Sequence, residues 1–93
     1  MTLHRYAKAR DANEPEVIEW LETHGYSVER IDVPCDLIVG KARRSHLVEV
    51  KMPKEKLTPA QMRFQRRHRG DYHIVRSGED AVAQLDKCAE VIR

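Results

Sequence analysis

The sequence predicts an α/β protein in which helices flank a mixed sheet. Two apolar runs, residues 36–40 and 46–52, are separated by the turn-forming segment Gly40 to Ser45, a pattern typical of a hairpin. A strong helix-start signal, Thr58-Pro-Ala-Gln61, follows the second run. Another short apolar run, residues 72–76, comes after that helix. Because a helix joins the third and fourth strands, those strands can pair in parallel.

The remaining elements follow from local signals. The first helix is expected to begin near Asn13, because residues 11–13 offer N-caps and Pro15 is tolerated only in a first turn. Gly25 should end that helix, a weak alternation over residues 27–31 indicates a strand, and Ser77 should cap a last helix with an apolar stripe. The predicted order is αβββαβα.

Composition indicates one domain and a modest core. The 93 residues are 34% charged, 41% hydrophobic and only 5% aromatic, so we expect a basic N-terminal arm at residues 1–10 and a single domain at residues 11–93. A net charge of +2 and a pI near 8.7 permit nucleic-acid binding without arguing for it. Two isolated cysteines favour reduced thiols in a cytoplasmic setting, and no apolar run approaches the roughly 20 residues that span a membrane.

The most informative motif is Glu49-Val-Lys51, thirteen residues after Asp36. Alternate side chains of a strand share a face, so Glu49 and Lys51 point one way, about 7 Å apart, while Val48 and Val50 point into a core. Pairing the two strands brings Asp36 beside them. Two carboxylates and an ammonium can hold a hard divalent cation and meet a phosphate, which suggests phosphodiester hydrolysis. The competing interpretation is an exposed surface pair beside a capping Asp.

Two further residues allow two roles each. Glu14 lies on the inner stripe of the first helix, one turn before Val17, so it can reach the metal site or only complement the helix dipole. Gln61 completes the capping box, yet it also lies one turn before Phe64 on the inner side of its helix. Capping and a role in the site are both compatible with that position.

Positive charge is densest around the second helix. It is carried by Lys54, Lys56, Arg63, Arg66, Arg67 and Arg69. These side chains either contact a DNA backbone or form a solvated face. The five histidines show no metal-ligand spacing, Trp20 is expected in the core or at a dimer contact, and Cys35 is expected to be a small buried residue.

Asp36 followed by Glu49-Val-Lys51, on an αβββαβ core, resembles the PD-(D/E)XK nuclease superfamily, which has a restriction-endonuclease-like fold. The segments Asp11-Ala-Asn-Glu14, Pro34 to Gly40 and Leu57 to Gln61 resemble the small VRR-NUC nucleases of phages and prophages. The layout is also similar to that of archaeal Holliday-junction resolvases. The resemblance covers residues 10 to 85.

The resemblance implies roles for particular residues. Asp36 and Glu49 would ligate Mg²⁺ or Mn²⁺, with Glu14 and the Val50 carbonyl as further ligands. Lys51 would assist the attacking water and the transition state, and Gln61 would lie near the active site. The implied activity is DNA endonuclease, with branched, flapped or four-way DNA as candidate substrates. The alternative is a non-cutting DNA-binding module of a phage replication or repair complex, and RNA remains open as a substrate.

Partners and location follow from that activity. DNA is the expected macromolecular partner, and no membrane is involved. Because each chain carries one site, symmetric cutting of both strands of a junction requires a homodimer. The expected location is the cytoplasm of a bacterial host, with the gene carried by a phage or prophage.

Overall fold

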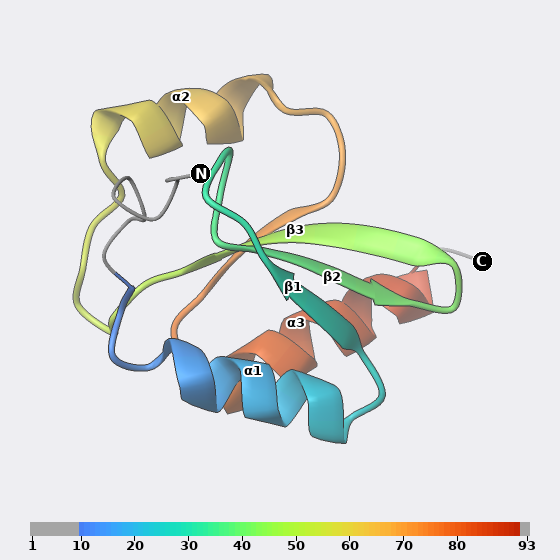
Figure 1. Cartoon of the computed structure of the whole chain (residues 1–93). Coiled ribbons are helices and arrows are strands. Elements are labelled where there is room, and N and C mark those ends of the chain that lie inside the picture. Colours follow the sequence, from blue (N-terminus) through green and yellow to red (C-terminus); the bar gives the residue numbers. More distant parts are fainter. Residues whose placement is uncertain (1–9, 92–93) are drawn as a thin grey trace, which may run out of the picture.

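The computed structural model describes residues 10–91 and shows a four-stranded sheet with helices on both sides (Figure 1). The elements are α1 (Glu14–Thr23), β1 (Ser27–Arg30), β2 (Leu37–Lys41), β3 (Arg44–Val50), α2 (Pro59–Arg67), β4 (Tyr72–Val75) and α3 (Gly78–Val91). This is the predicted order αβββαβα, including the C-terminal helix. The first nine residues of the predicted basic arm lie outside the described residues.

The sheet is mixed, with strand order β1-β2-β3-β4. β1 pairs with β2 and β2 with β3 in antiparallel fashion, whereas β3 and β4 are parallel and are joined through α2, as predicted. The β2–β3 hairpin turns at Ala42 and Arg43, whose φ angles are 54° and 67°. Positive φ at both central positions gives a turn whose twist matches that of the flanking strands. This turn sets the register in which Leu37 lies opposite Val48.

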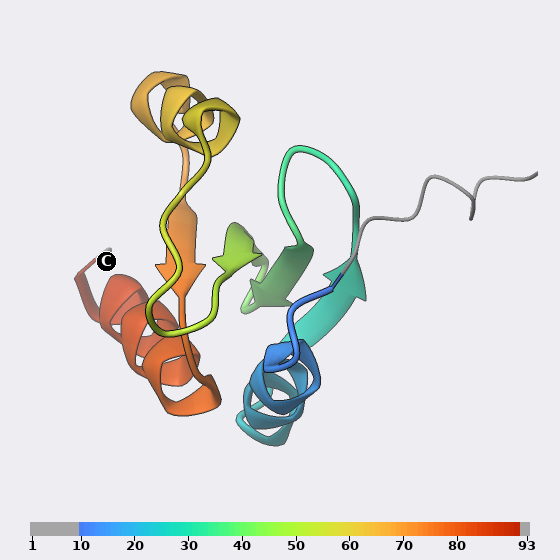
Figure 2. The same ribbon diagram turned by 90° about the vertical axis from the view of Figure 1, so that its left-hand side faces the viewer.

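The helices divide the sheet into two unlike faces. α1 and α3 lie together against one face, and α2 lies on the opposite side of the sheet (Figures 1 and 2). The core lies between the sheet and the α1–α3 pair. It contains Val17, Leu21, Leu37, Val39, Val48, Val50, Val75, Ala81 and Leu85, all buried. Val48 and Val50 therefore point into the core as predicted, so Glu49 and Lys51 point toward the α2 side.

Helix ends follow the sequence signals with one exception. Thr58 and Gln61 form the predicted capping box of α2. The Ser77 hydroxyl accepts a hydrogen bond from the Asp80 amide at 3.0 Å, and Gly25 follows α1 with φ of +91°. Asn13 precedes α1 but its side chain makes no cap bond. Instead, its amide donates to the carbonyls of Lys51 and Arg76, both at 3.0 Å, which ties the start of α1 to the ends of β3 and β4.

A close approach of α1 to α3 depends on a glycine. A Cβ atom on Gly78 would lie 2.2 Å from Trp20 Cδ1 and 2.7 Å from Trp20 Cβ, so only glycine fits beneath the indole. Trp20 is 37% exposed, and its ring stacks on His24 with 5.7 Å between centroids. The expectation that Trp20 lies in the core is therefore wrong, while a dimer contact stays a prediction.

We predict that Gly78→Ala destabilises the protein by roughly 1–3 kcal/mol, because the added methyl group overpacks the Trp20 contact. Helix propensity alone would give the opposite sign. Urea unfolding of the wild type and the variant measures the change. In a Trp20→Ala background the same substitution should cost far less, and an equal cost in both backgrounds would contradict the proposed contact.

Candidate functional site

Asp36 and Glu49 lie opposite each other at the end of the β2–β3 ladder. Leu37 pairs with Val48, and the Asp36 amide donates to the Val48 carbonyl at 3.2 Å, which continues the ladder by one residue. Asp36, Glu49 and Lys51 are 6%, 4% and 5% exposed. The interpretation of Glu49 and Lys51 as an exposed surface pair is therefore wrong. Three charged side chains are buried together on the α2 side of the sheet.

The backbone of β3 orients the Asp36 carboxylate. Asp36 Oδ2 accepts a hydrogen bond from the Val50 amide at 2.7 Å. The N–H and C=O groups of one strand residue point to the same neighbouring strand, so the Val50 carbonyl faces the side on which Asp36 lies. Asp36 and the Val50 carbonyl are thus held on one side of β3 where β2 has already left the ladder.

Glu14 reaches this region from α1, as its inward phase predicts. It is 1% exposed, and its Oε2 accepts from Arg30 Nε at 2.8 Å. Arg10 Nη1 lies 3.4 Å from Glu14 Oε2 and 3.5 Å from Asp36 Oδ1, so one guanidinium group connects the two carboxylates. The other oxygen, Glu14 Oε1, is buried and has no hydrogen-bond partner within residues 10–91.

Gln61 makes the predicted capping contact and also contacts Glu49, while a role in an active site stays a prediction. Its Oε1 accepts from the Thr58 amide at 2.9 Å, which completes the capping box. Its Nε2 donates to Glu49 Oε2 at 3.0 Å. The helix start therefore also fixes the Glu49 carboxylate. One turn further along α2, the Phe64 ring packs edge to face against the Tyr72 ring, with 4.9 Å between the ring centroids. This contact packs α2 against β4.

The pKa values of Cys35 and Tyr72 are raised beside the carboxylates of the site. Burial raises the pKa of the Cys35 thiol to about 11, and the charges of Glu49 and Asp36 add to the increase. Burial also raises the pKa of Tyr72, again with contributions from Glu49 and Asp36. Cys35 is fully buried, as expected. Both groups therefore remain neutral at pH 7.

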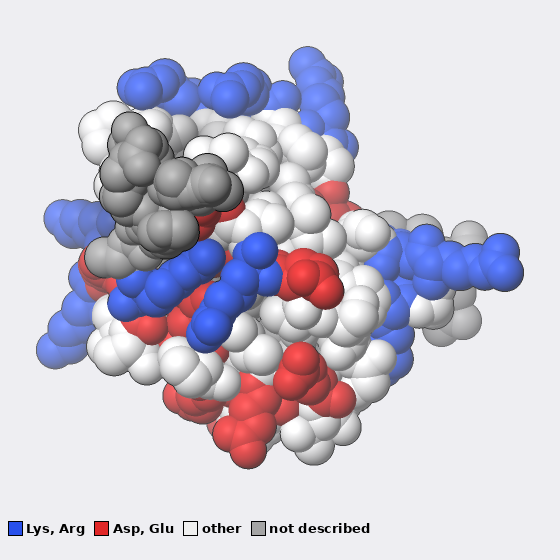
Figure 3. All heavy atoms as spheres, in the orientation of Figure 1, with Lys and Arg blue, Asp and Glu red and all other residues white. Residues whose placement is uncertain are grey.

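The predicted basic residues are exposed around α2. Lysine and arginine side chains gather along the edge of the molecule that α2 forms (Figure 3). The exposed members are Lys54, Lys56, Arg63, Arg66, Arg67 and Arg69. Arg67 also stacks its guanidinium over the Phe64 ring, 5.4 Å from the centroid. Their position on an outer face is confirmed, and contact with phosphates stays a prediction.

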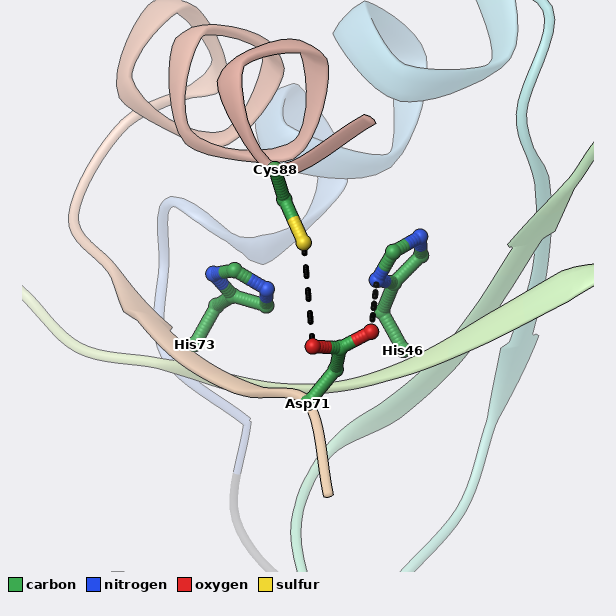
Figure 4. A group of neighbouring side chains, drawn as sticks. All are labelled: His46, Asp71, His73 and Cys88. Atoms are coloured by element: carbon green, nitrogen blue, oxygen red, sulfur yellow. Dashed lines mark hydrogen bonds and ion pairs between the residues drawn. The ribbon is translucent and has the colours of Figure 1, made fainter. Parts of the chain in front are cut away.

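A second polar cluster lies on the other face of the sheet, and it brings together two histidines whose sequence spacing shows no metal-ligand pattern. One ligand atom each from His46, Asp71, His73 and Cys88 all lie within 4.8 Å of one another (Figure 4). The sequence gives only a weak indication of this cluster, because its members lie in β3, just before and within β4, and in α3. One sign is available: Asp71 and His73 are two residues apart, as are His46 and Val48. Residues two apart in a strand point to the same face.

Burial lowers the pKa of His46, with further lowering from the charges of His73 and Arg44. The charge of Asp71 acts in the opposite direction and does not overcome burial. The His46 imidazole is therefore neutral at pH 7.

Comparison with protein-family models, with curated proteins and with solved structures finds no match. Within residues 10–91, none of the helices is both long and apolar enough to cross a membrane.

Proposed function

We propose that this chain is a metal-dependent DNA endonuclease of the PD-(D/E)XK type, similar to the VRR-NUC nucleases, with its active site at Asp36, Glu49 and Lys51. The observation that carries the proposal is the joint burial of these three charged side chains on one face of paired strands. Burial of charges is costly even when they are paired, and replacement by apolar residues is often neutral or stabilising. A chemical role explains why such a set occupies the end of the sheet.

The residues fit a hard divalent cation, Mg²⁺ or Mn²⁺. Asp36, Glu49 and the Val50 carbonyl would supply oxygen ligands. Glu14, whose buried Oε1 has no hydrogen-bond partner within residues 10–91, is the further ligand that the family resemblance implies. When bound, such an ion lowers the pKa of a coordinated water and polarises the phosphoryl oxygen.

The protein residues would hold this site in one geometry. The Val50 amide fixes Asp36, and the Gln61 amide fixes Glu49. Lys51 cannot ligate a cation, so its ammonium group would orient the water or stabilise the negative charge that develops on the phosphate. Groups fixed before the substrate arrives do not have to reorganise during the reaction, which is the main advantage of such a site.

The exposed basic residues of α2 and of the preceding loop supply a surface for the DNA backbone. Phosphate contacts of this kind are independent of sequence and depend strongly on salt. A homodimer would place two sites on one branched substrate. The cytoplasm of a bacterial host, with a phage or prophage gene, is the setting that the family resemblance favours.

A non-cutting DNA-binding module is the second candidate, since the basic residues support it without any contribution from the buried site. One experiment separates the two. The protein is incubated with Mg²⁺ or Mn²⁺ and a panel of linear, flapped and four-way DNAs, with matched RNAs in parallel. Metal-dependent cleavage supports the nuclease, and binding without cleavage of any substrate supports the module.

We expect Glu49→Gln and Asp36→Asn each to lower metal-dependent cleavage by roughly 10²–10³-fold or more, because each removes a charged oxygen ligand without changing side-chain size. Circular dichroism should show an intact fold. Glu29→Gln, an exposed glutamate on β1, is the matched control and should cleave normally. Cleavage near the wild-type rate in either site variant would refute the assignment.

Lys51→Met should stop turnover while Mn²⁺ binding persists. Methionine keeps most of the buried aliphatic stem but removes the ammonium group, which contributes to the reaction and not to coordination. Calorimetric titration with Mn²⁺ compares the two proteins. If the variant no longer binds Mn²⁺, Lys51 organises the metal ligands instead.

Changing Arg66 and Arg67 together to Ala should weaken DNA binding for all sequences. The plot of log affinity against log salt should become shallower by about one unit for each lost phosphate contact. Binding is measured in Ca²⁺ across a salt series, with Lys87→Ala on α3 as the control. Identical slopes for wild type and double variant would show that these arginines form only a solvated face.

A further inference from the structure

We propose that His46, Asp71, His73 and Cys88 form a second metal site, which would bind Zn²⁺ and link α3 to the sheet. This site lies on the α1–α3 face, whereas the proposed nuclease site lies on the α2 face. The proposal therefore stands independently of the proposed function.

Strand pairing places the four side chains together. Val48 pairs with His73 across the parallel β3–β4 ladder, so His46 and His73 share a face, and Asp71 lies just before β4. Cys88 approaches from α3, with Sγ 3.7 Å from Asp71 Oδ1, and His46 Nδ1 lies 3.4 Å from Asp71 Oδ2 (Figure 4). The ligands of a tetrahedral zinc ion lie roughly 3.3–3.8 Å apart, so the present spread of 4.8 Å needs a contraction of about 1 Å.

Two imidazole nitrogens in this cluster are poorly satisfied. His73 Nε2 is buried and has no hydrogen-bond partner within residues 10–91, and His46 Nδ1, also buried, has only a long ion-pair contact with Asp71 Oδ2. The 3.4 Å approach of His46 to Asp71 brings opposite groups near each other but is longer than an ordinary N–H···O bond. The side chain of His46 is only 3% exposed. A buried nitrogen without a hydrogen-bond partner is destabilising, which points to a missing ligand.

Gln84 fixes the tautomer of His73 in the form that a metal requires. The Gln84 amide nitrogen donates to the Ile74 carbonyl at 2.9 Å, so its oxygen is the atom that faces His73. That oxygen lies 3.3 Å from His73 Nδ1, which therefore carries the proton and donates it. The lone pair is left on Nε2, the nitrogen without a partner. A metal-bound histidine typically donates the hydrogen of its other ring nitrogen to an acceptor of this kind.

The donor set selects zinc over magnesium. Two imidazole nitrogens, one thiolate and one carboxylate suit a borderline-soft tetrahedral ion, whereas Mg²⁺ prefers six oxygen ligands. Arg44 Nη2 lies 2.8 Å from Asp71 Oδ2 and 3.5 Å from Cys88 Sγ. Its bond to Oδ2 leaves Asp71 Oδ1 to the ion. The thiolate and carboxylate would balance the charge of Zn²⁺.

Solvent can reach the cluster from one side. His46 and Arg44 contribute to the lining of a pocket of about 380 Å³ that lies beside the β2–β3 hairpin and α3. A bound ion would join β3, β4 and α3 at one point.

The test uses the full chain without a histidine tag, stripped with a chelator and then titrated with Zn²⁺ or Co²⁺. We expect about one ion per chain, a melting temperature that rises with Zn²⁺ concentration, and a thiolate-to-Co²⁺ charge-transfer band. Cys88→Ser should abolish that band, and Cys35→Ser is the matched control that should retain it. Gln84→Ala should weaken Zn²⁺ affinity by roughly 10–100-fold.

A measurement on the wild-type protein tests the proposal even if the variants do not fold. Zn²⁺ should protect Cys88 from alkylation, as mapped by mass spectrometry, and EDTA should restore its reactivity. The proposal is overturned if the chain binds no Zn²⁺, if Cys88 reacts equally with and without Zn²⁺, or if Cys88→Ser keeps the charge-transfer band. Cleavage activity enters none of these readouts, so failure here leaves the nuclease proposal untouched.

Discussion

The register of the β2–β3 hairpin is the constraint on which the rest of the structure depends. Ala42 and Arg43 hold left-handed backbone conformations, which cost about 1–2 kcal/mol for each residue. The register that this turn sets buries Val48 and Val50, and full burial of one valine contributes about 1.5–3 kcal/mol. Apolar burial therefore offsets the strained turn. A slip of one residue would exchange the faces, with Glu49 and Lys51 placed in the core.

Strand β3 places buried polar side chains on both faces of the sheet. Along β3, one set of alternate positions carries His46 and then two core valines, and the other set carries Glu49 and leads to Lys51 just past the strand end. The apolar valines separate two polar regions. The proposed oxygen ligands Asp36 and Glu49 lie on one side of them, and the cluster that offers nitrogen, sulfur and one carboxylate lies on the other, toward α3. This separation matches the different preferences of magnesium-like and zinc-like ions.

The features that could be predicted from the sequence are those fixed by local rules. The capping box at Thr58, the alternation around Glu49 and the inward phase of Glu14 each need only a few neighbouring residues. The histidine cluster could not be predicted in this way, because it depends on the parallel register of β3 and β4 and on the docking of α3. For the same reason Asn13 was expected as a cap, although its side chain joins two strand ends far along the chain.

Arg10 neutralises part of the negative charge of Glu14 and Asp36. Its guanidinium group lies between Glu14 and Asp36, so the chain carries its own counter-ion for two buried acids. A tethered charge acts at a high effective concentration and never diffuses away. If Glu14 and Asp36 hold a divalent cation as proposed, the cation must displace Arg10 when it binds, and Arg10 returns to the two carboxylates when the cation leaves.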